Sequence, residues 1–151
     1  MKKSNFTFTL LTDKSPHAVY EAVNNVRAWW SGFYEEHIEG DTEKPGDEFT
    51  FTAAGGAHIS KQKLVEVVPD KKIVWLIVDS EFSFVEKGDE WTGTKVIFDI
   101  SKKGNQTQLV FTHEGLTPEI ECYEDCSSGW SLYLTEKLAP LINATKTAMA
   151  N

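Results

Sequence analysis

The chain has 151 residues, the usual size of one domain, and 40% of them are hydrophobic, which is enough to form a core. Its formal net charge of -8 argues against nucleic acid and anionic membranes as partners, since both attract Lys and Arg. No apolar run is long enough for a transmembrane helix, and the first residues do not form a signal peptide. We therefore expect a single domain over residues 1–151, and two cysteines without a secretion signal favour a cytoplasmic location.

The first elements are predicted to be a strand followed by two short helices. Residues 6–11 alternate apolar side chains with threonine, which is typical of a half-buried strand. Ser15 is a suitable N-cap and Pro16 suits the first helical position, so a helix is expected to about Asn25. A second short helix is expected to run through Trp30 and to end at the following glycine.

A run of antiparallel strands is predicted over residues 34–114, with turns at "PDKK" and "KKGNQ". The period of two in the last pair of strands predicts these inward positions: Val96, Phe98, Ile100, Leu109, Phe111 and His113. Ile97 and Val110 break the polar pattern of the opposite face, so that face is not expected to be uniformly hydrated.

A long helix is predicted at the C-terminus, with Thr117 as its N-cap and Pro118 in its first turn. Its apolar stripe consists of Trp130, Tyr133, Leu134, Leu138 and Leu141. Gly129 and Pro140 are the positions where this helix could bend or break. The expected fold is therefore α+β: a curved antiparallel sheet of six to seven strands around the long C-terminal helix, with two short helices after the first strand.

This order of elements is accompanied by six local strings: "RAWWSG", "DEFTF", "VWLIVDS", "EWTGTKVIFDI", "FTHEGL" and "CSSGWSLYL". Together they resemble the START-like superfamily, also called SRPBCC, which has the helix-grip fold of the birch pollen allergen. Within it the chain is similar to the branch named for the activator of heat-shock-protein-90 ATPase. The resemblance implies a cavity between the concave sheet and the long helix. Members use that cavity for hydrophobic small molecules, and a minority carry out cyclisation or hydrolysis there.

The segment "FTHEGLTPEIECYEDC" raises the question of a metal site formed by His113, Cys122 and Cys126. Two cysteines at this spacing are admissible for zinc, but the fourth ligand has no candidate and no second paired motif exists. The simplest interpretation is that both cysteines are small apolar packing residues near the helix start. A Cys122–Cys126 disulfide, or a catalytic thiol activated by His113, stays open as an alternative.

Aromatic side chains are expected to line the cavity, because they suit an apolar ligand. The expected lining residues are Trp30, Trp75, Trp91, Phe98, Phe111, His113, Trp130 and Leu134. Trp75 and Trp91 are assigned to strands, and the adjacent Trp29 and Trp30 are expected to point in different directions. His113 is either a hydrogen-bonded structural histidine or a polar group aimed at a ligand.

Three functions are compatible with these features. The first is a binding protein for a hydrophobic or amphipathic small molecule, as a monomer or homodimer. The second is a co-chaperone-like domain that binds a protein partner through an apolar outer patch around Ile97 and Val110. The third is an enzyme that uses His113 as general acid or base with Tyr133 or Glu114. The sequence has no nucleophile elbow and no phosphate-binding motif, so we expect no cofactor.

The incomplete ligand set around Cys122 and Cys126 predicts that folding does not require a metal ion. Thermal unfolding should therefore be unchanged by a strong chelator, because no coordination bonds would be lost. A large drop in melting temperature on chelation, together with stoichiometric zinc in elemental analysis, would contradict this expectation.

Overall fold

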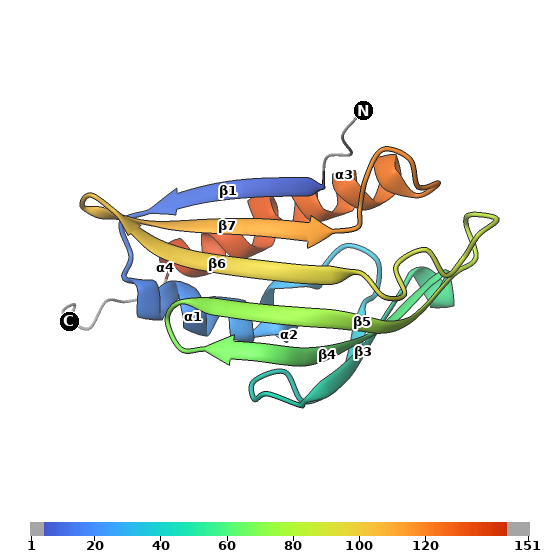
Figure 1. Cartoon of the computed structure of the whole chain (residues 1–151), viewed down its shortest axis with the longest axis horizontal. Helices are drawn as coiled ribbons and strands as arrows, with labels where there is room; N and C mark the ends of the chain where they lie inside the picture. The colour runs from blue at the N-terminus through green and yellow to red at the C-terminus, as the bar shows by residue number, and fades with distance from the viewer. Residues whose placement is uncertain (1–4, 145–151) are drawn as a thin grey trace.

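The computed structural model describes residues 5–144, and in them seven antiparallel strands form one curved sheet in the order β1-β7-β6-β5-β4-β3-β2 (Figure 1). The strands are β1 (Phe6–Thr12), β2 (His37–Gly40), β3 (Glu48–Ala53), β4 (His58–Val68), β5 (Lys72–Phe82), β6 (Lys95–Lys103) and β7 (Gln106–Glu114). The helices are α1 (Pro16–Asn24), α2 (Val26–Trp29), the short turn η1 (Ala54–Gly56), α3 (Tyr123–Tyr133), the π-helical turn η2 (Leu134–Leu138) and α4 (Ala139–Ala144). The helices that follow β1 and β7 lie on the same face of the sheet (Figure 1), which confirms the predicted helix-grip fold.

The inward positions predicted for β6 and β7 are confirmed. Across the two strands, Val96 faces His113, Phe98 faces Phe111, and Ile100 faces Leu109. All six side chains are buried, with exposed fractions of 5% or less. Ile97 and Val110 point the other way and are half-buried. The alternation therefore fixes which face of the sheet receives the helices.

The two short helices form as predicted, and Ser15 accepts a hydrogen bond from the Ala18 backbone N–H at 3.1 Å. Trp29 packs on Trp75 and Phe98 of the sheet, whereas Trp30 packs on Phe51 and Trp130, so the two adjacent rings have different neighbours although both enter the core. Trp30 lies just beyond α2 with ψ of 57°, outside the helical range, and its ring stacks on Trp29 at an interplanar angle of 18°. Both rings are buried, because this single turn of helix directs them both into the core.

The long helix begins at Tyr123, so the prediction that Thr117 caps it is wrong. The intervening residues form two successive turns, in which Ile120 donates to the Thr117 carbonyl and Tyr123 donates to the Ile120 carbonyl. Glu90, far away in the sequence, accepts hydrogen bonds from the backbone N–H groups of the two residues before Tyr123. This distant carboxylate therefore fixes the segment that leads into the helix, while Cys122 occupies the N-cap position that the local sequence had suggested for Thr117.

The C-terminal helix continues through both of its suspected breaks. Gly129 lies inside α3, and Pro140 lies inside α4. The irregularity falls between them in η2, where the Ala139 N–H donates to the Leu134 carbonyl five residues earlier. Proline has no N–H to continue the normal ladder, so a π turn immediately before Pro140 is a local solution that keeps the helix continuous.

Trp91 does not lie in a strand, contrary to the prediction, because β6 begins only at Lys95. Residues 89–94 form tight turns in which Thr92 donates to Asp89 and Thr94 donates to Trp91. Gly93 permits this path with a φ of +89°, a conformation that L side chains rarely adopt. The turns aim the Trp91 ring into the core, where it is 2% exposed.

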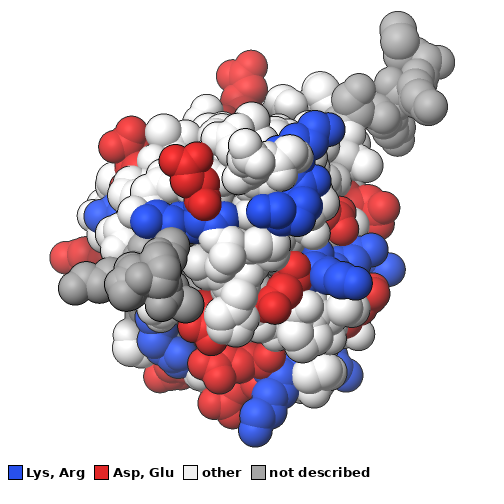
Figure 2. All heavy atoms as spheres, turned by 90° about the vertical axis from the view of Figure 1, so that its left-hand side faces the viewer, with Lys and Arg blue, Asp and Glu red and all other residues white. Residues whose placement is uncertain are grey.

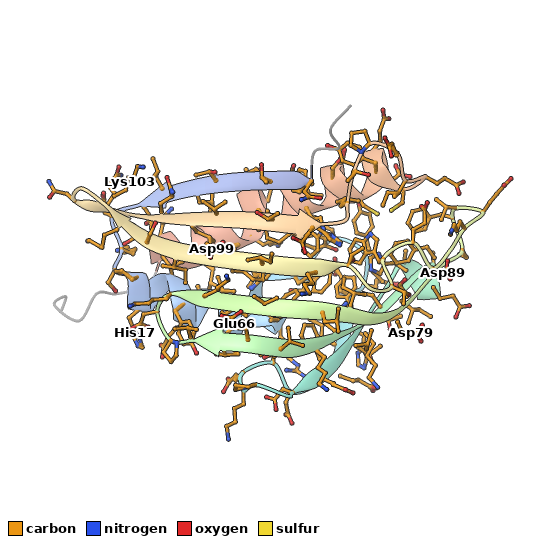
Figure 3. All side chains as sticks on the ribbon, viewed as in Figure 1. His17, Glu66, Asp79, Asp89, Asp99 and Lys103 are labelled. Atoms are coloured by element: carbon orange, nitrogen blue, oxygen red, sulfur yellow. The ribbon has the colours of Figure 1, made fainter. Side chains whose placement is uncertain are left out.

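The charged side chains lie on the outside of this fold. Figure 2 shows acidic and basic residues interspersed over one end of the molecule, without a continuous basic surface in that view. Figure 3 places Asp79 and Asp89 at one end of the sheet and Lys103, in the β6–β7 hairpin, at the opposite end. No helix formed by residues 5–144 is long and apolar enough to cross a membrane.

Trp130 joins the long helix to the sheet, so its removal should be strongly destabilising. The side chain is 2% exposed and packs against Phe111 at a centroid distance of 4.7 Å. Trp130→Ala should lower the free energy of unfolding by about 3–5 kcal/mol, measured by urea denaturation. Leu11→Ala is the control: that side chain is 53% exposed, and its loss should cost no more than about 0.5 kcal/mol. A loss below about 1 kcal/mol for Trp130→Ala would contradict its assignment as an anchor.

Candidate functional site

An apolar cavity of about 560 Å³ lies between the C-terminal helix and the end of the sheet where residues 83–93 project, at the right in Figure 1. Its walls come from the end of α2, from β3 and η1, from the start of β4, and from α3. The lining residues are Trp30, Tyr34, Phe51, Ala53, Ala54, His58, Phe84, Trp91, Asp125, Cys126, Ser128, Gly129, Trp130, Leu132 and Tyr133. The cavity reaches the surface where Tyr34 and Phe84 are 49% and 44% exposed.

Stacked aromatic rings form the deep wall of this cavity. Trp30 lies flat on Phe51, with ring centroids 3.7 Å apart, and also stacks on Trp130 at 4.9 Å. Trp91 is nearly parallel to Trp130, at an interplanar angle of 6°. Such faces bind flat apolar groups well, since they bury a large area and lose little conformational freedom.

His58 supplies a polar group to the same wall. Its ring packs among aromatic neighbours, 4.3 Å from Phe82 and 4.9 Å from Trp91 between centroids, and burial lowers its pKa. Its Nε2 lies 3.3 Å from the hydroxyl of Ser60, which accepts a hydrogen bond from the side chain of Gln62. Because Ser60 accepts from Gln62, its own proton is free to be donated to His58, which favours a neutral imidazole at the cavity wall.

Tyr133 lines the cavity and is bonded to Glu36, which lies behind it in the loop after α2. The Glu36 carboxylate accepts a short hydrogen bond from the Tyr133 hydroxyl and further bonds from the backbone N–H groups of Gly32, Phe33 and Tyr34. Burial acts to raise the pKa of Glu36, but these donors outweigh it and leave the pKa lowered. The pKa of Tyr133 is raised, first by burial and then by this hydrogen bond. The pair therefore holds the 32–36 loop against α3.

His113 lies beneath the cavity in a complete hydrogen-bond chain. The Trp130 indole N–H donates to Nδ1 of His113 at 3.0 Å, and Nε2 lies 2.8 Å from the Thr94 hydroxyl. Indole only donates, so Nδ1 carries no proton and Nε2 must carry the proton that is donated to Thr94. Thr94 in turn donates to the Trp91 carbonyl at 2.6 Å. His113 is thus a neutral histidine with both nitrogens satisfied inside the protein.

The eight expected lining residues divide into two groups. Trp30, Trp91 and Trp130 line the cavity. The other five, namely Trp75, Phe98, Phe111, His113 and Leu134, are buried in the packed core behind it and do not contribute to its surface. The partners suggested for His113 are also elsewhere, because Glu114 is exposed and Tyr133 donates to Glu36.

Sequence reasoning missed the polar wall and the rim. His58 was recoverable from parity, because it shares the inward face of β4 with Ser60, Gln62 and Leu64. Three polar residues on a concave face are unusual for a simple core, and that pattern was the available signal. Tyr34 and Phe84 lie outside the strands, where periodicity places no side chain.

Cys122 and Cys126 are free thiols at the start of α3, and Cys126 reaches the cavity wall. His113 is not joined to them: both of its nitrogens are bonded to Trp130 and Thr94. Within residues 5–144, no group of three or more His, Cys, Asp and Glu side chains is placed to hold a metal ion.

Comparison with protein families matches residues 13–143 to the model described as "Activator of Hsp90 ATPase homolog 1-like protein". A search of curated proteins gives no match. The Aha1 dimer from Colwellia psychrerythraea is a similar solved structure, with a TM-score of 0.68 and 22% identity over 88% of this chain and 92% of that one. Protein CV1439 from Chromobacterium violaceum also has a TM-score of 0.68, with 20% identity over 91% and 96% of the two chains. CalU16 from Micromonospora echinospora has a TM-score of 0.63 and 18% identity over 93% and 76%. At these identities the likeness concerns the fold.

The buried His113 predicts a characteristic loss of stability in acid. Burial lowers its pKa from 6.5 to about 3, with a smaller contribution from His58. As the pH falls below 6.5, His113 becomes protonated in the unfolded chain, whereas in the folded chain it stays neutral down to about pH 3. The free energy of unfolding should therefore decrease as the pH falls across that window. The contribution should approach about 1.4 kcal/mol per pH unit, measured by urea unfolding at several pH values.

His113→Gln should remove that contribution from the acid slope and lower stability at neutral pH by about 1–3 kcal/mol, because the Trp130 and Thr94 partners lose their geometry. His37→Gln is the matched control at an exposed position and should leave the stability at neutral pH nearly unchanged. An unchanged slope in His113→Gln would show that this histidine titrates normally in the folded protein.

Proposed function

From the premise that this chain belongs to the activator of Hsp90 ATPase homolog 1-like family, we propose that it binds a hydrophobic or amphipathic small molecule in the aromatic cavity. The observation that carries the proposal is the cavity itself. A volume of about 560 Å³ lies within the range of small-molecule sites, and its walls combine large aromatic faces with few polar groups.

The arrangement of the walls supports an amphipathic ligand with a flat apolar part. The rings of Trp30, Phe51 and Trp130 would receive that part in the interior. Asp125 and Ser128 also line the cavity from α3, and His58 lines it from β4, so a polar group of the ligand has donors and acceptors to meet. Asp125 disfavours an anionic head group at this point, which makes a neutral or cationic one the better match.

The remaining properties follow the same proposal. An acidic protein with reduced cysteines suits the cytoplasm, where thiols are kept reduced. A net charge of -8 disfavours nucleic acid and anionic membranes as partners. The oligomeric state is a monomer or a homodimer, and one solved structure of similar fold is described as a dimer.

A second candidate function is binding of a protein partner, which the description of the family favours. On the outer face of the sheet Ile97 pairs with Val74, while Val110 lies on the neighbouring strand β7. Ile97 and Val110 are half-buried, so they offer a small apolar surface. Replacing both by threonine would weaken a partner complex and leave small-molecule binding intact, which separates the two functions.

Gly129 offers a direct test of the cavity. It lines the cavity from α3, and a Cβ built there meets no atom within 4 Å. Gly129→Phe should fill the space and weaken binding of the neutral apolar probe N-phenyl-1-naphthylamine at least about tenfold, or about 1.4 kcal/mol. Binding is measured by the increase in probe fluorescence on titration.

Gly129→Ala is the matched control, because the methyl group barely enters the cavity while alanine is the better helix former by up to about 1 kcal/mol. It should bind the probe as the parent does and unfold at a slightly higher temperature. Glu124→Phe adds an aromatic side chain to an exposed position of the same helix and should also leave binding unchanged. If Gly129→Phe and Gly129→Ala bind the probe with equal affinity, the probe does not bind in this cavity and the proposed site is wrong.

A further inference from the structure

Cys122 and Cys126 hold their sulfur atoms unusually close at the start of α3. The Cys126 thiol donates to the sulfur of Cys122 across 2.7 Å. The spacing of four residues puts both side chains on one side of the first turn, where the Cys126 N–H also bonds to the Cys122 carbonyl. A disulfide bond is about 2.05 Å long, so bond formation requires the sulfurs to approach by only roughly 0.6 Å.

The surroundings of the pair are buried yet open to the cavity on one side. Cys122 is fully buried, and Cys126 is 7% exposed and contributes to the cavity wall. The Trp91 indole N–H is buried without a hydrogen-bond partner of its own and lies close enough to both thiols to act on their acidity. A buried, otherwise unpartnered donor beside two sulfurs is suited to a thiolate, since it supplies a stabilising dipole.

The two thiols differ in acidity. The pKa of Cys122 is lowered, first by the hydrogen bond from Cys126, against burial, with further help from the Trp91 indole. The pKa of Cys126 is raised, first because it gives its proton to Cys122 and then by burial. The Cys126 proton is thus held between the two sulfurs, while the Cys122 proton is easier to lose. Disulfide formation uses such a difference, because one sulfur attacks as a thiolate and the second then completes the S–S bond.

We propose that Cys122 and Cys126 are a redox-active dithiol that closes to an intramolecular disulfide when a small peroxide enters the cavity. One thiolate attacks an oxygen of the peroxide, the O–O bond breaks, and a sulfenic acid forms while the released hydroxide takes up a proton to give water. The second thiol then attacks the sulfenic sulfur, forming the S–S bond and releasing a second water. Two thiols and one hydrogen peroxide thereby give one disulfide and two waters, the two electrons passing from sulfur to oxygen.

The position of the pair gives the disulfide a structural consequence. Cys122 is the last residue before α3, and its N–H is one of the two that Glu90 accepts. Glu121, its neighbour, accepts hydrogen bonds from the Glu86 backbone N–H with both carboxylate oxygens and from the Lys87 backbone N–H with Oε1. A new covalent bond at Cys122 therefore acts where the helix start holds the 83–91 segment, which carries Trp91 on the cavity wall. The reaction itself is independent of the proposed small-molecule ligand.

The experiment treats the full-length reduced protein with a modest excess of hydrogen peroxide, quenches it in acid, and unfolds it before alkylation. Intact mass spectrometry should show a monomer lighter by two hydrogen atoms that accepts no alkyl group, and dithiothreitol should restore two alkylation sites. Peptide mapping should place the bond between Cys122 and Cys126. The fluorescence of the native protein should change in step with the mass, because Trp91 adjoins the sulfurs.

Cys122→Ser and Cys126→Ser are the matched controls, since each keeps a small polar side chain but removes one sulfur. Neither variant should reach the oxidised monomeric product, and each should keep one alkylation site or accumulate an oxygen adduct. If the parent protein keeps both alkylation sites, or instead yields sulfinic acid or disulfide-linked dimers, the proposal is overturned. Probe binding by the reduced protein is measured separately, so failure of the dithiol leaves the proposed ligand site untouched.

Discussion

The hydrogen bond from Trp130 to His113 ties together the parts of the fold that surround the cavity. Trp130 belongs to the long helix, His113 to β7, and Thr94 to the segment that leads into β6. The hydrogen bonds run from Trp130 through His113 and Thr94 and end at the Trp91 carbonyl. Each of these side-chain donors therefore has a protein acceptor, and no water is needed. A buried chain of this kind fixes the distance between helix and sheet, because any shift leaves a polar group unsatisfied.

The cavity exists because the sheet changes its pairing at one end. Strands β5 and β6 pair from Lys72 to Leu76 only, and beyond that point β5 continues beside β4 alone. The 83–94 segment folds back over the freed edge, where Ile77 exchanges hydrogen bonds with Gly93 and Thr94. Trp91 enters the core from this segment and covers one side of the opening. All five tryptophans of the chain form one contiguous ring cluster. These rings fill the middle of the core, and the cavity lies at the edge of the cluster.

The sequence predicted what depends on local periodicity. Alternation gave the inward faces of β6 and β7, and Ser15 with Pro16 gave the start of α1, because both signals lie within a few residues of the structure they specify. It did not predict the start of α3, where Glu90 holds the two residues that precede the helix, or the turn that carries Trp91. It also identified only three lining residues of the cavity, since much of the rim comes from loops, whose side-chain directions depend on contacts far away in the chain. His58 is the exception, because its inward position on β4 could have been read from the pattern.

The pairing of the polar groups bears on what chemistry this cavity can support. His113 has both nitrogens engaged, Tyr133 gives its proton to Glu36, and Glu36 accepts three backbone donors besides. Groups held in this way stabilise the walls, and using one of them as a general acid or base would break a buried hydrogen bond at a cost of about 1–3 kcal/mol. The cysteine pair differs, because the thiol that lines the cavity is bonded to another thiol, and oxidation replaces that contact with a stronger one. The cysteine pair is therefore the part of the wall to which we assign reactivity in the proposal, while the aromatic rings and the paired polar groups give the cavity its shape.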